Sequence, residues 1–134
     1  MVKNNNNGRS ELFIMIKLKS RKDLRFKRQV RLRSKISGSS EQPRLCIFVS
    51  NKYIYVQIID DIKGHTLVAA STKEKNFDMD NKKNIAAAER LGEIIAQRAL
   101  ENRVKKIVFD RSGYKYHGRV MAIAEAMRKL GLVF

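Results

Sequence analysis

The sequence predicts a single α/β domain of α+β character, in which a small mixed sheet carries its helices on one face and a basic arm precedes it. Three observations support this prediction. Segments with strand and helix periodicity follow one another in the order βββαβα. The chain has 134 residues, which suits one domain of ordinary size. Its basic side chains are most concentrated near the N-terminus.

The N-terminal part of the chain lacks the hydrophobic periodicity of a folded domain. Residues 1–16 begin with the polar stretch MVKNNNNG and are predicted to be a poorly ordered extension, although translation could also begin at Met15. Residues 17–42 form a basic arm that ends in the Ser/Gly-rich linker SGSSEQP. The globular α/β domain is predicted over residues 43–134.

The net charge of +16 points to a polyanionic partner, because such an excess repels itself in a compact fold. Residues 1–37 hold 12 basic and two acidic side chains. A helix in this arm would carry cations on nearly every face, so we expect the arm to order only on RNA or DNA. The alternative is a solvated charged tail with no partner. The candidate phosphate-binding residues of the arm are Lys17, Lys19, Arg21, Lys22, Arg25, Lys27, Arg28, Arg31, Arg33 and Lys35.

Three strands are expected in the first half of the domain. Residues 44–50 are rich in β-branched and aromatic side chains, and residues 53–60 place aliphatic side chains on alternate positions. The connection at 51–52 predicts a hairpin, since its asparagine tolerates a left-handed backbone. A turn around Gly64 leads to a third strand at 66–72. These segments predict three consecutive antiparallel strands.

Two helices and a fourth strand complete the domain. From about residue 81 to residue 102, apolar side chains recur three and four positions apart, which predicts a helix packed on the sheet. Residues 105–110 return to strand character. A second apolar stripe predicts a helix from about residue 117 to residue 130, which Gly131 ends. With both helices on one face, the other face of the sheet is left for a different contact.

The segment FDRSGYKYHGRV, residues 109–120, holds an aspartate, a serine and a histidine between the fourth strand and the last helix. A catalytic triad would use these three residue types, but Ser112 lacks the G-x-S-x-G elbow and nothing marks an oxyanion hole. Ser112 is more simply a turn residue. Asp110 is expected to pair with Arg111 or Arg119, or to accept hydrogen bonds from turn amides.

A surface for phosphates and bases explains more of this segment. Its arginines and lysine can bind phosphates, its glycines allow close backbone approach, and its planar rings can stack on exposed bases. For any single tyrosine, packing in the core is an equally good interpretation. The candidate nucleic-acid-binding residues here are Arg111, Ser112, Gly113, Tyr114, Lys115, Tyr116, His117, Gly118 and Arg119.

A metal-dependent nuclease is the main enzymatic alternative, since hydrolysis by two metals needs several convergent carboxylates. The aspartates at 60–61 and Asp110 end expected strands, and Glu89 or Glu93 could project from the first helix. Against this, the neighbouring aspartates should point apart, and Arg111 would adjoin any cation bound at Asp110. We therefore predict no catalytic residues.

Other classes of protein find little support in the sequence. One cysteine, Cys46, and two distant histidines do not make a four-ligand zinc site. No apolar run is long enough to span a membrane, and no glycine-rich phosphate loop is present. A single cysteine forms no intramolecular disulfide, which fits an intracellular protein. No metal, cofactor, small-molecule substrate or membrane partner is predicted.

The segments PRLCIFVSNKYIYVQIIDD, TLVAAST, FDRSGYKYHGRV and GLVF resemble the family of large-subunit ribosomal protein eighteen, of bacterial and organellar type, over residues 17–134. The resemblance implies a topology related to ribonuclease H without its catalytic carboxylates, and no enzymatic activity. It also implies that the protein binds 5S rRNA, attaches it to 23S rRNA and meets neighbouring large-subunit proteins in the central protuberance. A location in ribosomes of the bacterial cytoplasm, or of a plastid or mitochondrion, is then expected.

By the same resemblance, the basic arm corresponds to an RNA-bound N-terminal segment, while residues 50–53 and 111–119 belong to an RNA-facing surface. Two features depart from the family pattern. Residues 1–14 have no recognised counterpart, and the first helix of the domain lacks a glycine at its end, where Asn102 is expected to take the left-handed backbone. The predicted RNA-facing surface also includes Arg44, Ser50, Asn51, Lys52, Tyr53 and Tyr55.

Overall fold

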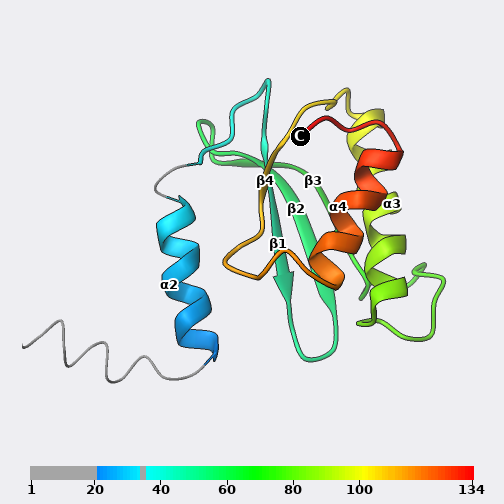
Figure 1. The fold of residues 1–134 in the computed structure, drawn as a ribbon. Helices are drawn as coiled ribbons and strands as arrows, with labels where there is room; N and C mark the ends of the chain where they lie inside the picture. The colour runs from blue at the N-terminus through cyan, green and yellow to red at the C-terminus, as the bar shows by residue number, and fades with distance from the viewer. Residues whose placement is uncertain (1–20, 34–35) are drawn as a thin grey trace, which may run out of the picture.

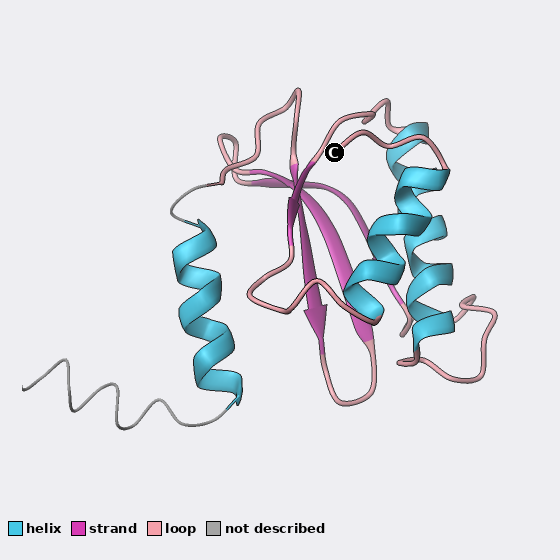
Figure 2. Ribbon diagram, in the orientation of Figure 1, coloured by secondary structure: helices cyan, strands magenta, loops and turns pink. Residues whose placement is uncertain are grey.

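The computed structural model describes residues 21–33 and 36–134 of the chain (Figure 1). After an N-terminal helix, the elements follow the predicted order βββαβα. The strands form one mixed sheet, and two helices run side by side on one of its faces (Figure 2). In chain order the elements are α2 (Arg21–Arg33), β1 (Arg44–Val49), β2 (Ile54–Asp60), β3 (His65–Ser71), α3 (Ile85–Glu101), β4 (Val108–Asp110) and α4 (Arg119–Lys129).

The strand order of the sheet is β3-β2-β1-β4. β1 pairs antiparallel with β2 and parallel with β4, and β2 pairs antiparallel with β3. A parallel partner requires a crossover, which the chain makes through α3. The pairing of Cys46 with Asp110 brings the segment after β4 beside the second half of β1. Residues 111–119 therefore begin at an edge of the sheet.

The core lies between the sheet and the pair α3 and α4. Alternate positions of β1 and β2 are fully buried aliphatic side chains, so each strand has one apolar face. The two helices approach closely at Gly92, where a Cβ atom would lie 2.8 Å from the carbonyl oxygen of Ile123 and 2.9 Å from the Cβ of Ala126. Both helices leave the opposite face of the sheet uncovered, as predicted.

The end of α3 and the beginning of β4 differ from the sequence-based expectation. The left-handed residue after α3 is Arg103, with φ 64°, whereas Asn102 has φ −93° and donates from its side-chain amide to the carbonyl of Arg98. β4 begins only at Val108, because the chain before it pairs with the C-terminal segment instead. The amide of Val133 donates to the carbonyl of residue 105, and the amide of residue 107 donates back to Val133.

The predicted Ser/Gly linker is attached to the body of the protein. Gly38 is buried, its amide donates to the Asp61 carboxylate over 2.7 Å, and its carbonyl accepts from the Asp61 amide over 3.1 Å. A Cβ atom at Gly38 would lie 2.3 Å from the backbone nitrogen of Arg44. The linker therefore packs on the domain at Gly38, because the Cβ atom of any other residue would overlap the backbone of Arg44.

The basic arm also differs from expectation within the described residues. Residues 21–33 form the helix α2, although their charge predicts order only on nucleic acid. α2 lies against the loop that follows β4, where Arg25 and Arg28 donate hydrogen bonds to backbone carbonyls. These tertiary contacts stabilise a helix that its own charge repulsion would oppose.

An ion pair fastens the loop after β3 to the covering helix α3. Both carboxylate oxygens of Glu74 accept hydrogen bonds from the guanidinium of Arg98, over 2.7 and 2.9 Å. Arg98 also donates to the carbonyl of Ala69 in β3 over 2.8 Å. Hydrogen bonding to Arg98 holds the pKa of Glu74 below its ordinary value. The pair therefore stabilises the fold only while Glu74 is ionised.

We expect Glu74→Gln to lower the free energy of unfolding at neutral pH by about 0.5–1 kcal/mol, the range of partly exposed pairs. Because the folded-state pKa is lowered, the contribution is complete above the ordinary carboxyl pKa and is lost as the pH falls through the folded value. Urea denaturation from pH 7 to pH 3 measures the difference. Glu89→Gln is the control, since Glu89 is exposed and makes no ion pair with a described residue. A difference that persists at pH 3 would contradict the assignment.

Candidate nucleic-acid interface

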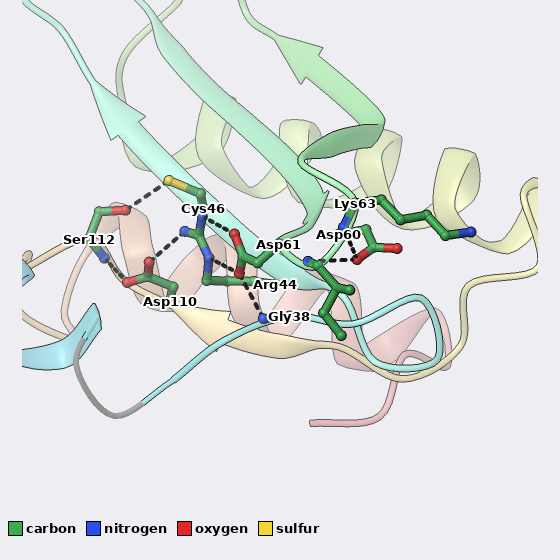
Figure 3. A network of polar contacts seen from close by, with 9 residues as sticks. Gly38, Arg44, Cys46, Asp60, Asp61, Lys63, Asp110 and Ser112 are labelled. Carbon is green, nitrogen blue, oxygen red and sulfur yellow. Dashed lines mark hydrogen bonds and ion pairs between the residues drawn. The ribbon is translucent and has the colours of Figure 1, made fainter.

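A buried arginine, Arg44, lies between two carboxylates at the first position of β1 (Figure 3). The guanidinium of Arg44 donates to Asp110 over 2.8 Å and to both oxygens of Asp61 over 2.9 and 3.0 Å. Hydrogen bonding to Asp61, followed by the negative charge of Asp61 and the hydrogen bond to Asp110, raises the pKa of Arg44 above its ordinary value. Arg44 thus links β1 to β4 and to the turn after β2.

The same carboxylate fixes the loop after β4. The second oxygen of Asp110 accepts the backbone amide of Ser112 over 2.8 Å, so the prediction of a bond to a turn amide is confirmed. The predicted ion pair with Arg111 or Arg119 is wrong, because Arg44 from the neighbouring strand takes that position. Ser112 adopts φ 56°, a left-handed conformation that this hydrogen bond helps to hold.

Two side chains of the loop extend the edge of the sheet beyond the last residue of β4. The hydroxyl of Ser112 accepts the amide of Ile47 over 3.3 Å, and the hydroxyl of Tyr114 accepts the amide of Val49 over 2.9 Å. These backbone donors of β1 would otherwise be unpaired, since β4 has only three residues. The loop consequently has a fixed position on β1.

α2 docks on this fixed loop. Arg25 donates to the carbonyl of Ser112 over 3.0 Å, and Arg28 donates to the carbonyl of Gly113 over 2.9 Å. The Arg25 guanidinium also lies 4.5 Å from the centre of the Tyr114 ring. Gly113 has φ 81°, and a Cβ atom there would lie 2.3 Å from the carbonyl oxygen of Arg25. The glycine thus permits close approach of the helix backbone.

A groove of about 870 Å³ lies between α2 and the loops of the sheet. Six of its lining side chains are cations and none is a carboxylate. The aromatic rings of Phe48 and Tyr114 also line it. Such a concentration of uncompensated positive charge attracts a polyanion. The lining cations of this basic groove are Arg21, Lys22, Arg25, Arg28, Lys115 and Arg119.

Aromatic side chains continue from the groove onto the open face of the sheet. Phe48 is 50% exposed and its ring centre lies 5.9 Å from that of Tyr55, which in turn lies 6.4 Å from Tyr53. The Lys73 ammonium is 5.9 Å from the centre of the Tyr53 ring. Phe48 was missed by sequence analysis. Successive side chains of a strand point to opposite faces of the sheet, so a buried Ile47 places the neighbouring Phe48 on the open face, and this pattern could have identified it.

Three of the predicted RNA-binding residues are buried. The side chains of Arg44 and Ser112 belong to residues that are 4% and 1% exposed, and Gly113 is buried under α2. In this arrangement their side chains are turned into the protein, and their assignment to the RNA-facing surface stays a prediction. Their role is to hold the framework of the groove. Tyr114 is half-buried, with its hydroxyl bound to β1 and one ring face against Arg25.

The predicted segment 115–119 divides between two places. Lys115 and Arg119 line the basic groove, whereas His117 and Gly118 line a separate groove between α3 and α4. Tyr116 is 40% exposed.

The remaining predicted residues lie around the basic groove or beyond the described structure. Ser50 and Asn51 line the groove from the turn between β1 and β2. Exposed or partly exposed positions elsewhere are taken by Lys27, Arg31, Lys52 and Arg111. Lys17, Lys19 and Lys35, and the side chain of Arg33, are outside the described part of the chain.

The aspartates considered for a nuclease are bound to an arginine or to backbone amides. Asp61 and Asp110 both bind Arg44, while Asp60 accepts the amides of residues 62 and 63, so the two neighbours point apart as predicted (Figure 3). Among the described residues there is no group of three or more side chains suited to hold a metal ion. In the same described residues, no helix combines the length and the apolar character needed to cross a bilayer.

We expect Arg44→Leu to lower the free energy of unfolding by about 3–5 kcal/mol, because it removes the guanidinium that the fully buried carboxylate of Asp110 binds. Urea denaturation at pH 7 measures the loss. Arg90→Leu is the matched control, since Arg90 also pairs with two acidic residues but is 37% exposed, and should lose less than about 1 kcal/mol. Equal losses in the two variants would contradict the importance of the buried network.

The whole described domain matches known proteins. The family model "Ribosomal L18 of archaea, bacteria, mitoch. and chloroplast" matches residues 19–134. The chain is 55% identical to the large ribosomal subunit protein uL18 of Dictyoglomus thermophilum and 53% identical to that of Thermotoga petrophila, each over 122 residues, 90% of this chain and all of the relative. Identity to the uL18 protein of Bacillus cytotoxicus is 54% over 110 residues, 82% of this chain and 92% of that protein. The predicted resemblance is confirmed, and the chain belongs to the ribosomal protein L18 family.

Proposed function

We propose that this protein is a structural component of the large ribosomal subunit, where it binds 5S rRNA and helps to attach it to 23S rRNA in the central protuberance. The basic groove is the observation that carries this proposal, because six cations without a carboxylate fit a folded RNA better than any small ligand. Membership of the L18 family, whose relatives are named as large ribosomal subunit proteins, supports the ribosomal context.

Phosphate binding falls to the cations that line the groove. α2 contributes four of them and the segment from Lys115 to Arg119 contributes two. Arg25 and Arg28 each use one donor on a loop carbonyl. A guanidinium has five N–H donors in a fixed fork, so both retain donors for phosphate oxygens. Contact with the loop thus orients the arginines before RNA arrives, which reduces the entropy lost on binding.

Base contacts fall to the aromatic side chains beside the groove. Phe48, Tyr53 and Tyr55 present rings on the open face of the sheet. Bases in RNA loops and bulges are unstacked and can lie on such rings, with about 1–3 kcal/mol per base. Phosphate contacts alone would not distinguish one RNA from another, so these rings are where selectivity for 5S rRNA is expected.

The first test compares binding of the purified full chain to a 5S rRNA transcript and to a transfer RNA, each across a salt series. We expect 5S rRNA to bind more tightly at moderate salt. In the variant Lys115→Gln/Arg119→Gln, the slope of log K against log salt should fall by about 2, because two phosphate contacts are lost. Lys105→Gln/Lys106→Gln removes the same charge from exposed positions outside the groove and should leave the slope nearly unchanged. Equal affinity for both RNAs would refute a selective 5S site.

Phe48→Ala tests the aromatic surface. We expect affinity for 5S rRNA to fall by about 1–3 kcal/mol with an unchanged salt slope, since stacking involves no phosphate. Half of Phe48 is exposed, so the variant should remain folded by circular dichroism. Leu100→Ala, a truncation at another partly exposed apolar position, is the control and should bind normally. An unchanged affinity in Phe48→Ala would exclude a base contact there.

A further inference from the structure

A second groove, of about 460 Å³, lies between α3 and α4. Figure 1 shows this helix pair and α2 on opposite sides of the sheet. The floor is apolar and includes Met121, Ala122 and Ala126 of α4. At its ends lie Ile85, which is 57% exposed, and Leu130, which is 38% exposed. The groove therefore leaves apolar side chains in contact with solvent, as binding surfaces often do.

The rim of this groove is acidic. Glu89 and Glu93 of α3 and Glu125 of α4 line it, and Lys129 is the one lysine or arginine among its lining residues. Glu93 has a partner in Arg90, over 3.1 Å. Glu89 and Glu125 make no ion pair with any described residue. We call this feature the acidic groove.

The two grooves select different partners. The basic groove has six cations and no carboxylate, whereas the acidic groove has three carboxylates and one lysine. RNA phosphates would be repelled by unpaired glutamates, and an apolar floor offers them no hydrogen bonds. A polypeptide that carries both aliphatic and cationic side chains satisfies floor and rim together.

We propose that the acidic groove binds a Lys/Arg-rich amphipathic segment of a neighbouring large-subunit protein. Its aliphatic side chains lie on the α4 floor between Met121 and Leu130, and its cations pair with Glu89 and Glu125 across the groove. His117 lines the same groove and so belongs to the protein contact and not to the RNA contact. This inference rests on the proposed function, because it requires assembly into the large subunit.

The test places a photo-crosslinking residue, benzoylphenylalanine, at Ile85 or at Leu130 in the full chain, which is then assembled into large subunits and irradiated. Both positions are exposed, so that the failure of one variant to fold leaves the other. We expect crosslinks to a protein, at a segment rich in Lys and Arg as read by mass spectrometry. A crosslink to rRNA, a crosslink to an acidic segment, or none in fully assembled subunits would overturn the proposal.

Charge variants test the recognition itself. Glu89→Gln/Glu125→Gln should lower the crosslink yield by about five-fold or more, as expected for two partly exposed ion pairs. Glu41→Gln/Glu101→Gln removes two exposed carboxylates that do not line the groove and should leave the yield unchanged. An undiminished yield in the first variant would refute recognition by these glutamates.

A third position separates this inference from the proposed function. Benzoylphenylalanine in place of Phe48 should crosslink to rRNA in the same subunits. If it does so while the positions of Ile85 and Leu130 give no crosslink to a protein, the proposed function stands and the acidic groove has no such partner. If the chain does not assemble into large subunits at all, the proposed function fails and the inference fails with it.

Discussion

The contact between Arg44, Asp61 and Asp110 is the constraint on which the rest of the structure depends. Removing three charges from water costs desolvation free energy, and this cost is offset only when each charge keeps its partners at hydrogen-bonding distance. Arg44 therefore holds β4 against β1 and the turn after β2 against both. The Asp61 carboxylate also accepts the amide of Gly38, which attaches the start of the domain to the same point.

The position of the proposed RNA surface follows from this contact in two steps. Asp110, held by Arg44, accepts the amide of Ser112 and sets the path of the loop. Ser112 and Tyr114 then take over the hydrogen bonds of β1 that a longer β4 would have made. The carbonyls of Ser112 and Gly113 in this loop accept hydrogen bonds from Arg25 and Arg28 of α2. A buried ion pair thus determines where exposed cations stand, although it contacts no RNA itself.

The distribution of charge divides the protein into two sides. Cations from α2 and from the segment 115–119 gather in the basic groove, while three glutamates gather between α3 and α4. The segment 115–119 contributes to both, since Lys115 and Arg119 line the basic groove and His117 and Gly118 line the acidic groove. A chain of net charge +16 that also carries an acidic groove is suited to a particle in which one side meets RNA and another meets basic protein.

The sequence by itself determined the order of strands and helices, the face that α3 and α4 cover, the basic arm and the family. Periodicity and charge are properties of neighbouring residues, so they are readable without the fold. The sequence could not distinguish the buried Arg44 from the exposed arginines, because the partners of Arg44 lie 17 and 66 positions away along the chain. The docking of α2, and the presence of glutamates from α3 and α4 in one groove, were likewise decided by tertiary structure. Such contacts depend on which distant segments the sheet brings together, and no local pattern records that.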